Sequence, residues 1–318
     1  MSRRRQAFLS FLGIAASGLG AFLLYRVVKR YDMAEIGAAM ASVSMTTVAL
    51  ALLFTLIGYG FLAGCEYLAV RYAGQRMSLP RVAFTAAAAL GIGHSIGLAA
   101  LSSGAVRLRM YGRVGADLAA VGRVVAFAGV TVALSMGLVG GLAILWHSEQ
   151  LGEATSVSPL ILKSVAYLAF ALVLAYLVLC RFRTGDFAVR RFRIKVPSLG
   201  MALAQLVCGA GHLLSVSAVL YVAVRNFTDA DYATLAALYV GADLSALVGH
   251  VPGGWGVIEY IVTSALEGPQ LLAGLIIFRV TYYLVPLAVG VTILIVDELS
   301  SRRIVQRGLQ PSSPSYRR

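Results

Sequence analysis

The chain has 318 residues, of which 59% are hydrophobic and 13% charged, and its mean hydropathy is +0.82. This composition excludes a water-soluble globule, because too few polar side chains remain to cover its surface. The 27 lysines and arginines against 14 acidic residues could indicate a nucleic-acid binder, but they stand in short segments between apolar stretches, as in cytoplasmic loops. We therefore predict an all-α polytopic membrane protein, a single transmembrane domain over 1–318 with no nucleic-acid partner.

The chain opens with a basic segment, 1–5, and a first apolar stretch at 7–27. This stretch is longer than the apolar region of a secretory signal peptide, so we predict a retained span. The arginines before it place the N-terminus in the cytoplasm under the positive-inside rule. Residues 32–42 then predict a short helix that lies on the outer interface of the membrane.

Further apolar stretches carry the chain across the membrane, because about twenty residues span the hydrocarbon core. They lie at 47–70, 82–101, 119–145, 160–180, 200–224, 232–250, 257–266 and 270–296. The arginine-containing connections after 47–70 and before 119–145 should lie inside, whereas the connection 146–159 contains no lysine or arginine and should lie outside. The basic tail, 301–318, is then cytoplasmic, and both termini face the same side.

Two of these stretches cannot be simple crossings under this charge pattern. Residues 82–106 must begin and end inside, and residues 232–267 must begin and end outside. We predict two re-entrant hairpins, broken at 102–104 and 252–256, beside about six full spans. Non-helical backbone is tolerated at membrane depth only where protein or a water-filled cavity satisfies it, so the two breaks indicate a cavity.

The stretches also repeat along the chain. One set begins near 7, 47, 82 and 119 and a second near 160, 200, 232 and 270, an offset of about 150 residues that reverses the direction of every element. This spacing predicts an inverted-topology repeat with halves 1–150 and 151–300. The hypothesis depends on spacing and charge, because residue identity between the halves is not evident.

The sharpest motif is HVPGGWGVIEYIV, residues 250–262. Pro252 and the glycines, among them Gly254 and Gly256, break one helix. A helix that restarts near Val257 would point its backbone N–H groups into the membrane interior, where they attract an anion. A phosphate site and a bare turn that requires glycine explain this motif equally well.

A second motif, SSGAVRLRMYGR, covers residues 102–113. Ser103 and Gly104 could cap a helix, and Arg107 and Arg109 follow within two turns, so hydroxyl, amide and guanidinium groups could converge on one phosphate. The alternative is that these arginines lie at the headgroup level and only signal topology. They are also shallow if the hairpin turns instead at Gly91, Gly93 and Gly97. Both interpretations stay open on sequence alone.

Arg279 lies roughly 13 Å from the outer face of the membrane, at 1.5 Å per residue into the last span. A lone charge at that depth is costly, so we expect it to face a cavity or to pair with Glu259, Glu66 or Asp243. If it binds substrate and forms no structural salt bridge, Arg279→Ala should abolish transport and leave folding nearly intact.

Other polar residues near these motifs are weaker candidates for substrate binding or coupling. Tyr282 and Tyr283 could complete a polar face beside Arg279. Glu66 and Arg71 stand five residues apart, so each would pair better with a residue of a different helix. We treat both as candidate residues for coupling transport to an energy source. The four histidines and three cysteines show no metal or disulfide spacing, and no nucleotide-binding or catalytic motif occurs. We expect no cofactor, no metal and no enzymatic activity.

The segments SSGAVRLRMYGRVG, HVPGGWGVIE and FRVTYYLVP resemble the transmembrane flippase region of bacterial lysylphosphatidylglycerol synthases, and more closely its stand-alone YbhN-type relatives in the inner membrane. The resemblance covers nearly the whole chain. It implies an integral inner-membrane protein that moves lipids or lipid-linked headgroups between leaflets. Carried over residue by residue, the functional positions of the family fall on Arg107, Arg109, Tyr111, Arg113, Pro252, Gly254, Gly256, Glu259, Arg279, Tyr282 and Tyr283.

The chain departs from this family in three respects. Glu66, the acid of the second span, is displaced by one position from its usual spacing to Arg71. Leu108 stands where many relatives have an aromatic residue, and no residues remain to build the aminoacyl-transferase domain of the fused members. We therefore expect no synthase activity.

The resulting functional hypothesis is a lipid flippase of the bacterial inner membrane. Its partner would be an anionic phospholipid or a polyprenyl-phosphate lipid, held by Arg279, Arg107 or Arg109 and by the amides after Gly254. Two alternatives stay open: a lipid-binding scaffold for a separate lipid-modifying enzyme, and a transporter of a small soluble anion. A homo-oligomer is also compatible with the sequence.

Overall fold

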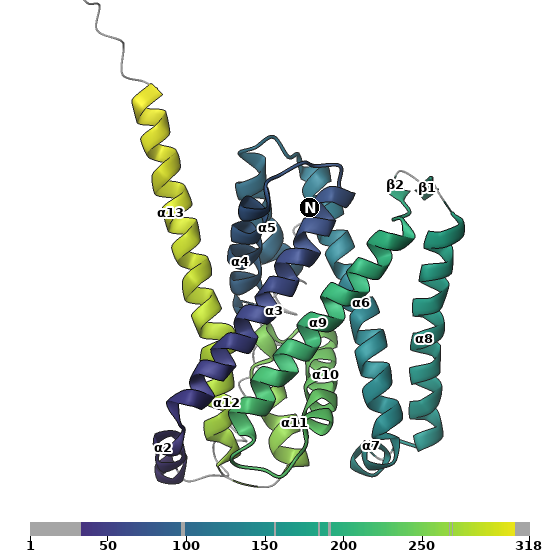
Figure 1. Cartoon of the computed structure of the whole chain (residues 1–318), viewed down its shortest axis with the longest axis vertical. Helices are drawn as coiled ribbons and strands as arrows, with labels where there is room; N and C mark the ends of the chain where they lie inside the picture. The colour runs from purple at the N-terminus through teal and green to yellow at the C-terminus, as the bar shows by residue number, and fades with distance from the viewer. Residues whose placement is uncertain are drawn as a thin grey trace, which may run out of the picture.

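The computed structural model describes residues 33–96, 99–155, 157–183, 185–189, 192–266, 268 and 270–308. This part of the chain is a helical bundle with one small strand pair (Figure 1). Within it, 5 helices are long and apolar enough to cross a membrane: α3 (Met45–Tyr72), α6 (Leu118–Trp146), α8 (Pro159–Phe182), α9 (Leu199–Val224) and the continuous helix Leu271–Ser300. The predicted all-α polytopic membrane fold is confirmed. The predicted first span, 7–27, lies outside the described residues.

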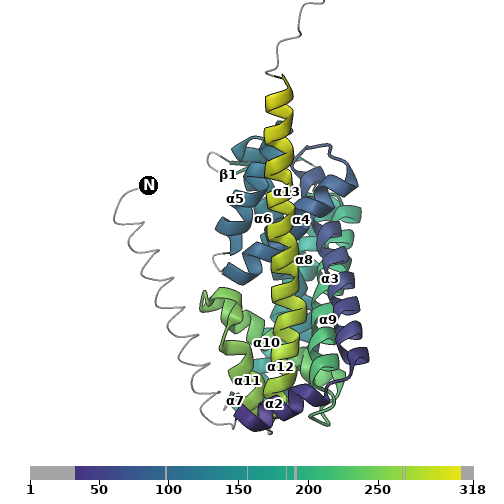
Figure 2. The ribbon, with the colours of Figure 1, turned by 90° about the vertical axis from the view of Figure 1, so that its left-hand side faces the viewer.

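Two pairs of shorter helices enter the bundle without crossing it. The pair α4 (Leu79–Ile96) and α5 (Ala99–Gly112) occupies the upper half of Figures 1 and 2, and the pair α10 (Tyr232–Val248) and α11 (Val257–Ala265) occupies the lower half. We call them the first and second hairpin. Both predicted re-entrant hairpins are present, and they enter the bundle from opposite ends.

The first hairpin turns earlier in the chain than the break predicted at 102–104. Because α4 ends at Ile96 and α5 begins at Ala99, residues 102–104 lie inside a helix, and the predicted break there is wrong. The Ser103 hydroxyl accepts a hydrogen bond from Arg107 one turn later, at 2.7 Å. A serine whose side chain has a partner on its own helix does not need to end that helix.

The second hairpin breaks where the sequence predicts. The short 3₁₀ turn η1 (Pro252–Gly254) follows α10, and Gly256 precedes the first residue of α11. Gly253, Gly254 and Gly256 have φ of 58°, 63° and 80°. Glycine adopts this left-handed region without a steric penalty, which explains why three glycines are needed in one turn.

The order of elements follows the predicted repeat. In Figure 1, α3 rises, the first hairpin enters from above and α6 descends; α9 then descends, the second hairpin enters from below, and the last helix rises through α12 (Leu271–Arg279), the π-helical turn η2 (Val280–Leu284) and α13 (Val285–Gly308). This arrangement is compatible with inverted halves, and their common origin stays a prediction.

Several connections have structure of their own. The short helix predicted at 32–42 is α2 (Met33–Ser42), and its position at the membrane interface stays a prediction. The sequence did not predict α7 (Ser148–Thr155), the antiparallel strands β1 (Asp186–Val189) and β2 (Phe192–Lys195), or the extension of the last helix to Gly308. These elements lie in or beyond connections, where hydropathy carries little information.

Side-chain caps set where the helices begin. Each cap oxygen accepts a hydrogen bond from a backbone N–H of the first turn, which has no partner within the helix. In the described helices this role falls to Ser44, Asp117, Ser158, Ser198 and Asp231. The hydrogen bond from the Thr234 backbone N–H at 2.8 Å lowers the pKa of the Asp231 carboxyl.

Glycines allow the helices to approach closely. A Cβ at Gly211 of α9 would lie 2.6 Å from the Phe61 ring of α3, and a Cβ at Gly91 of α4 would overlap the Pro286 carbonyl of α13. Small residues let helix backbones meet in membranes, where no hydrophobic force drives them together. The first hairpin is thereby seated against α13.

We expect Gly91→Ala to lower the free energy of unfolding by about 1–3 kcal/mol, because the added methyl group forces α4 away from the Pro286 backbone. Thermal unfolding in detergent micelles measures this change. Gly122→Ala is the matched control, since a Cβ there meets nothing within 4 Å. That variant should gain about 0.5–1 kcal/mol from helix propensity, and equal stability of both variants would contradict the close contact.

Candidate functional site

A cavity of about 280 Å³ lies between the two hairpins. His94 and Arg107 of the first hairpin line it, together with Asp243, Gly253 and Gly254 of the second hairpin and its turn. The remaining walls come from α3, α6, α9 and η2 and are mostly apolar. The predicted cavity is therefore present, and residues far apart in the sequence form it.

A buried ion pair ties the first hairpin to α3. Arg107 of α5 donates from Nε to Glu66 Oε1 at 2.8 Å and from Nη2 to Glu66 Oε2 at 2.7 Å. The Tyr111 hydroxyl donates to Glu66 Oε1 at 2.9 Å, and both charged side chains are 2% exposed. We call Glu66, Ser103, Arg107 and Tyr111 the first ion-pair cluster. Its bidentate geometry is the strong form of such a contact.

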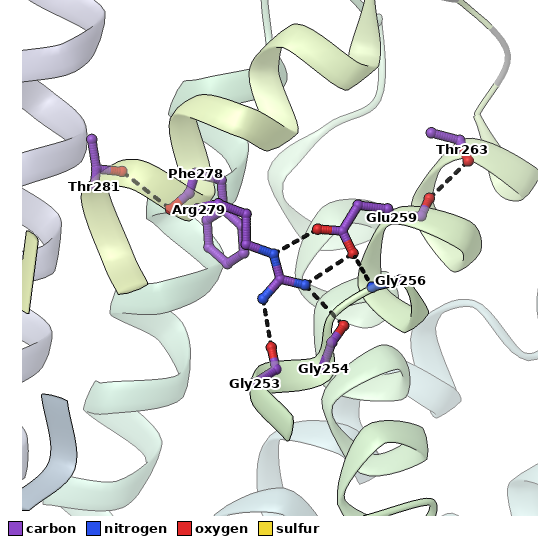
Figure 3. Close-up of polar contacts among 8 residues, drawn as sticks. All are labelled: Gly253, Gly254, Gly256, Glu259, Thr263, Phe278, Arg279 and Thr281. Carbon is purple, nitrogen blue, oxygen red and sulfur yellow. Dashed lines mark hydrogen bonds and ion pairs between the residues drawn. The ribbon is translucent and has the colours of Figure 1, made fainter. Parts of the chain in front are cut away.

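A second buried ion pair ties the second hairpin to the last span (Figure 3). Arg279 of α12 donates from Nε to Glu259 Oε1 at 2.6 Å and from Nη2 to Glu259 Oε2 at 2.9 Å. Its guanidinium also donates to the carbonyls of Gly253 and Gly254. We call these four residues with Gly256 the second ion-pair cluster. Arg279 thus pairs with Glu259, one of the three predicted partners.

Aromatic rings complete the surroundings of Arg279. Its guanidinium carbon lies 4.7 Å from the centre of the Trp255 ring and 4.6 Å from that of Tyr283. Rings at this distance stabilise a cation through their electron-rich faces. The π-helical turn η2 carries Tyr282 and Tyr283, which both line the cavity.

These contacts change the predicted phosphate site. The backbone N–H of Gly256, at the start of α11, donates to Glu259 Oε2 at 2.8 Å, so the anion at this helix start is a carboxylate of the chain itself. Arg279 is bound to the same carboxylate and does not line the cavity. Arg107 and Arg279 were predicted to hold phosphate. In this structure each is bound instead to a glutamate carboxylate within the bundle.

The other predicted arginines lie apart from the cavity. Arg109 forms an ion pair with Glu298, and Arg113 pairs with Asp297 and Glu298, all partly exposed and midway along α13. Arg109 is 48% exposed, as the topology interpretation predicts. Arg71 donates to the Tyr67 hydroxyl at 3.2 Å and does not join Glu66.

Gly104, Gly254 and Pro252 act through the backbone and through packing. Gly104 lies within α5, and a Cβ there would touch Val125 at 3.8 Å. Gly254 lines the cavity and turns the chain between α10 and α11. Pro252 opens the same turn as the first residue of η1.

The sequence interpretation missed two histidines. His94 of α4 and His212 of α9 both line the cavity, with ring centres 6.4 Å apart. The signal was present, because an ionisable side chain within an apolar stretch is costly and is a functional candidate by default. Among the described residues, no group of three or more His, Cys, Asp or Glu side chains could hold a metal ion.

No protein-family model matches the chain. It is 26% identical over 261 residues to the uncharacterized protein slr0712 of Synechocystis sp., covering 81% of each chain. It is also 20% identical over 205 residues to the inner membrane protein YbhN of Escherichia coli, covering 63% of this chain and 64% of YbhN.

These similarities support a YbhN-like membrane protein. Together with the apolar helices of the structure, they support a multi-pass inner membrane protein. The predicted similarity to YbhN-type proteins is confirmed. The similarity to the lysylphosphatidylglycerol synthase region and the cytoplasmic placement of both termini stay predictions.

Proposed function

We propose that this protein is a lipid translocase that takes a headgroup into the cavity between its two hairpins. The observation that carries the proposal is the position of this cavity, which opposed re-entrant hairpins enclose within a bundle of membrane-spanning helices. Transporter sites typically lie near the bilayer midplane between repeats of opposite orientation. The resemblance to the flippase region, although carried by motifs alone, favours a lipid over other cargo.

The cavity size suits a headgroup. A volume of about 280 Å³ is at the small end of the range for small-molecule sites, so the acyl chains would stay in the membrane. Tyr239, Tyr282 and Tyr283 supply hydroxyl groups to the lining, where Arg107 lies bound to Glu66. This set can hydrogen-bond the phosphate of an anionic phospholipid or of a polyprenyl phosphate, the substrate class that we propose. Chemistry on the lipid is not part of this proposal.

The ion pairs indicate which parts would move together. The first ion-pair cluster joins α5 to α3, and the second joins α11 to α12. Each hairpin would therefore move with the span to which its ion pair ties it. Opening of the cavity would also require the first hairpin to shift on α13, against which Gly91 and Arg109 hold it. In this mechanism Arg279 is a positioning residue for the turn that lines the cavity.

Proteoliposomes test the proposal directly. Vesicles that contain the purified protein and a labelled lipid should lose leaflet protection of that lipid faster than empty vesicles, and an anionic headgroup should move faster than a zwitterionic one. Comparison of phosphatidylglycerol, phosphatidylcholine and a polyprenyl phosphate identifies the headgroup class that the protein moves. Folded protein that moves none of these lipids would exclude translocation.

A cavity-blocking variant links transport to this site. Leu247 lines the cavity and is 53% exposed, so Leu247→Trp should fill the space without disturbing the fold. We expect at least a tenfold slower rate, the effect of about 1.4 kcal/mol of lost binding. Leu244→Trp places the same side chain on the same helix away from the lining and should move lipid at the wild-type rate. Equal rates in both variants would contradict passage through this cavity.

The two alternative functions give different results in the same preparation. A scaffold would co-purify with a stoichiometric partner enzyme and move no lipid. A transporter of a small soluble anion would take up labelled phosphate or sulfate into the vesicles and leave every lipid in its leaflet.

A further inference from the structure

The cavity between the two hairpins has an exposed side. Among the described residues that line it, three are exposed and the others are buried or half-buried. The exposed ones are Val132 of α6, which is 45% exposed, and Leu247 and His250 at the tip of the second hairpin. A residue that lines a cavity and is also exposed marks its mouth. The cavity therefore opens between α6 and the tip of the second hairpin.

Contacts along α6 show where this mouth begins and ends. A Cβ at Gly104 of α5 would touch Val125 of α6 at 3.8 Å, and a Cβ at Gly140 of α6 would touch Val240 of α10 at 3.1 Å. The first hairpin therefore packs on the upper part of α6 and the second hairpin on its lower part, as their positions in Figure 2 agree. Val132 lies between the two contacts, seven residues after Val125 and eight before Gly140.

The register of the helices places Val132 opposite Leu247. In Figure 1, α6 descends while α10 rises, so residues before Gly140 lie level with residues after Val240. Val132 stands eight residues before the one and Leu247 seven after the other, which puts both about 10–12 Å from the contact at 1.5 Å per residue. They thus lie on opposite sides of the mouth. We call Val132, Leu247 and His250 the portal.

The portal lies at the middle of the membrane. Fourteen residues of α6 precede Val132 and fourteen follow it, so it is roughly 21 Å from either end of a span that crosses about 30 Å of hydrocarbon. Leu247 is the second-last residue of α10, a helix that ends inside the bundle. A Cβ at Gly129, one turn before Val132, would meet nothing within 4 Å, so this face of α6 is open. The portal therefore faces hydrocarbon.

An opening at this depth favours one kind of ligand. A small soluble anion would have to cross about 15 Å of hydrocarbon to reach it, and the transfer of a charge into an apolar medium is costly. The chains of a lipid are already in that medium. Val132 and Leu247 offer them apolar surface, while His250 adds an amphipathic ring where a polar headgroup and an apolar chain would meet.

We propose that the hydrocarbon chains of a transported lipid lie in the portal while its headgroup occupies the cavity. The inference rests on the proposed translocation and adds to it the place where the chains leave the protein. Because the portal is at the midplane, a chain that lies in it can swing from one leaflet to the other without leaving hydrocarbon. The hydrocarbon chain is then part of the substrate, and a water-soluble phosphate compound without a chain is not carried.

A photoreactive lipid tests this placement. Phosphatidylglycerol that carries a diazirine within the first few carbons of an acyl chain is placed in proteoliposomes, and the cross-linked residues are identified by mass spectrometry. In the free bilayer this group lies near the headgroups, so it reaches the midplane only when the headgroup occupies the cavity. We expect at least about tenfold more label at 128–136 and 244–251 than at Leu168 and Leu172, which are exposed at the middle of α8 and lie at the same depth.

A blocking variant gives an independent measurement. Val132→Trp fills the portal from α6, and we expect it to slow the movement of labelled phosphatidylglycerol at least about tenfold and to remove the label at 244–251. Val130→Trp is the matched control, because Val130 is 42% exposed on the same helix but outside the lining. That variant should keep the wild-type rate and label. Thermal unfolding at the wild-type temperature shows that both variants are folded.

The outcomes separate this inference from the proposed function. Phosphatidylglycerol that moves but labels the portal no more than the middle of α8 overturns the portal and leaves translocation standing. The same holds for equal rates in folded Val132→Trp and Val130→Trp. Absence of lipid movement from folded wild-type protein overturns both, and uptake of labelled phosphate in its place would identify a substrate without a chain.

Discussion

Replacement of Arg107 by methionine should lower the free energy of unfolding by about 3–5 kcal/mol. The methionine side chain fills a similar volume, but it leaves the Glu66 carboxylate buried without its bidentate partner. The Ser103 hydroxyl also loses its donor. Denaturant titration of the purified protein in mixed micelles measures the change.

Two further variants isolate the cause. Arg109→Met removes an arginine two residues away on the same helix, but that ion pair with Glu298 is exposed and should be worth less than about 1 kcal/mol. The double variant Glu66→Met and Arg107→Met removes both buried charges and should recover most of the lost stability. A loss in Arg107→Met no larger than in Arg109→Met would show that the buried pair does not hold the first hairpin.

Replacement of Arg279 by methionine should lower the free energy of unfolding by at least about 3 kcal/mol. It leaves Glu259 unpaired, and the carbonyls of Gly253 and Gly254 lose their donor. Such buried acceptors are expensive to leave unsatisfied. We therefore expect the turn of the second hairpin to open, and hydrogen exchange over 250–262 to accelerate. The structure thus replaces the sequence-based expectation that an Arg279 variant folds normally.

Arg279→Lys tests whether charge alone is sufficient. A lysine keeps the positive charge but not the planar fork that reaches both carboxylate oxygens and two carbonyls, so most of the loss should remain. Arg225→Met is the control, because Arg225 is an exposed residue at the end of α9. Unchanged hydrogen exchange over 250–262 in Arg279→Met would contradict the role of this residue in shaping the turn.

The two ion-pair clusters have a similar arrangement. In each, the second arm of a hairpin is joined to a neighbouring span by one arginine and one glutamate, but the arginine lies on the hairpin in the first cluster and on the span in the second. The first hairpin is also held by α13, through the close approach of Gly91 and the ion pairs of Arg109 and Arg113. Members of both clusters, Glu66 and Arg107 in the first and Gly253 and Gly254 in the second, also line the cavity.

Hydropathy and charge were sufficient to predict most of the architecture. The spans from 47–70 to 270–296 differ from the helices of the structure by a few residues at most ends, because each span depends on its own composition. The re-entrant hairpins were predicted only from the side of the membrane on which the basic connections must lie. The break at 252–256 was readable because glycine and proline act locally. Residues 102–104 instead lie inside α5, where Ser103 accepts a hydrogen bond from Arg107.

The sequence by itself therefore determined the membrane fold, the two hairpins and the candidate residues, because hydrophobicity and backbone preference are properties of short segments. Only the tertiary structure decided which of these residues meet. Glu66 and Arg107 are separated by 41 positions, and His94 and His212 come from different halves of the chain. Coulomb forces and hydrogen bonds act through space, so the same arginines that a sequence assigns to phosphate become partners of carboxylates once the helices pack.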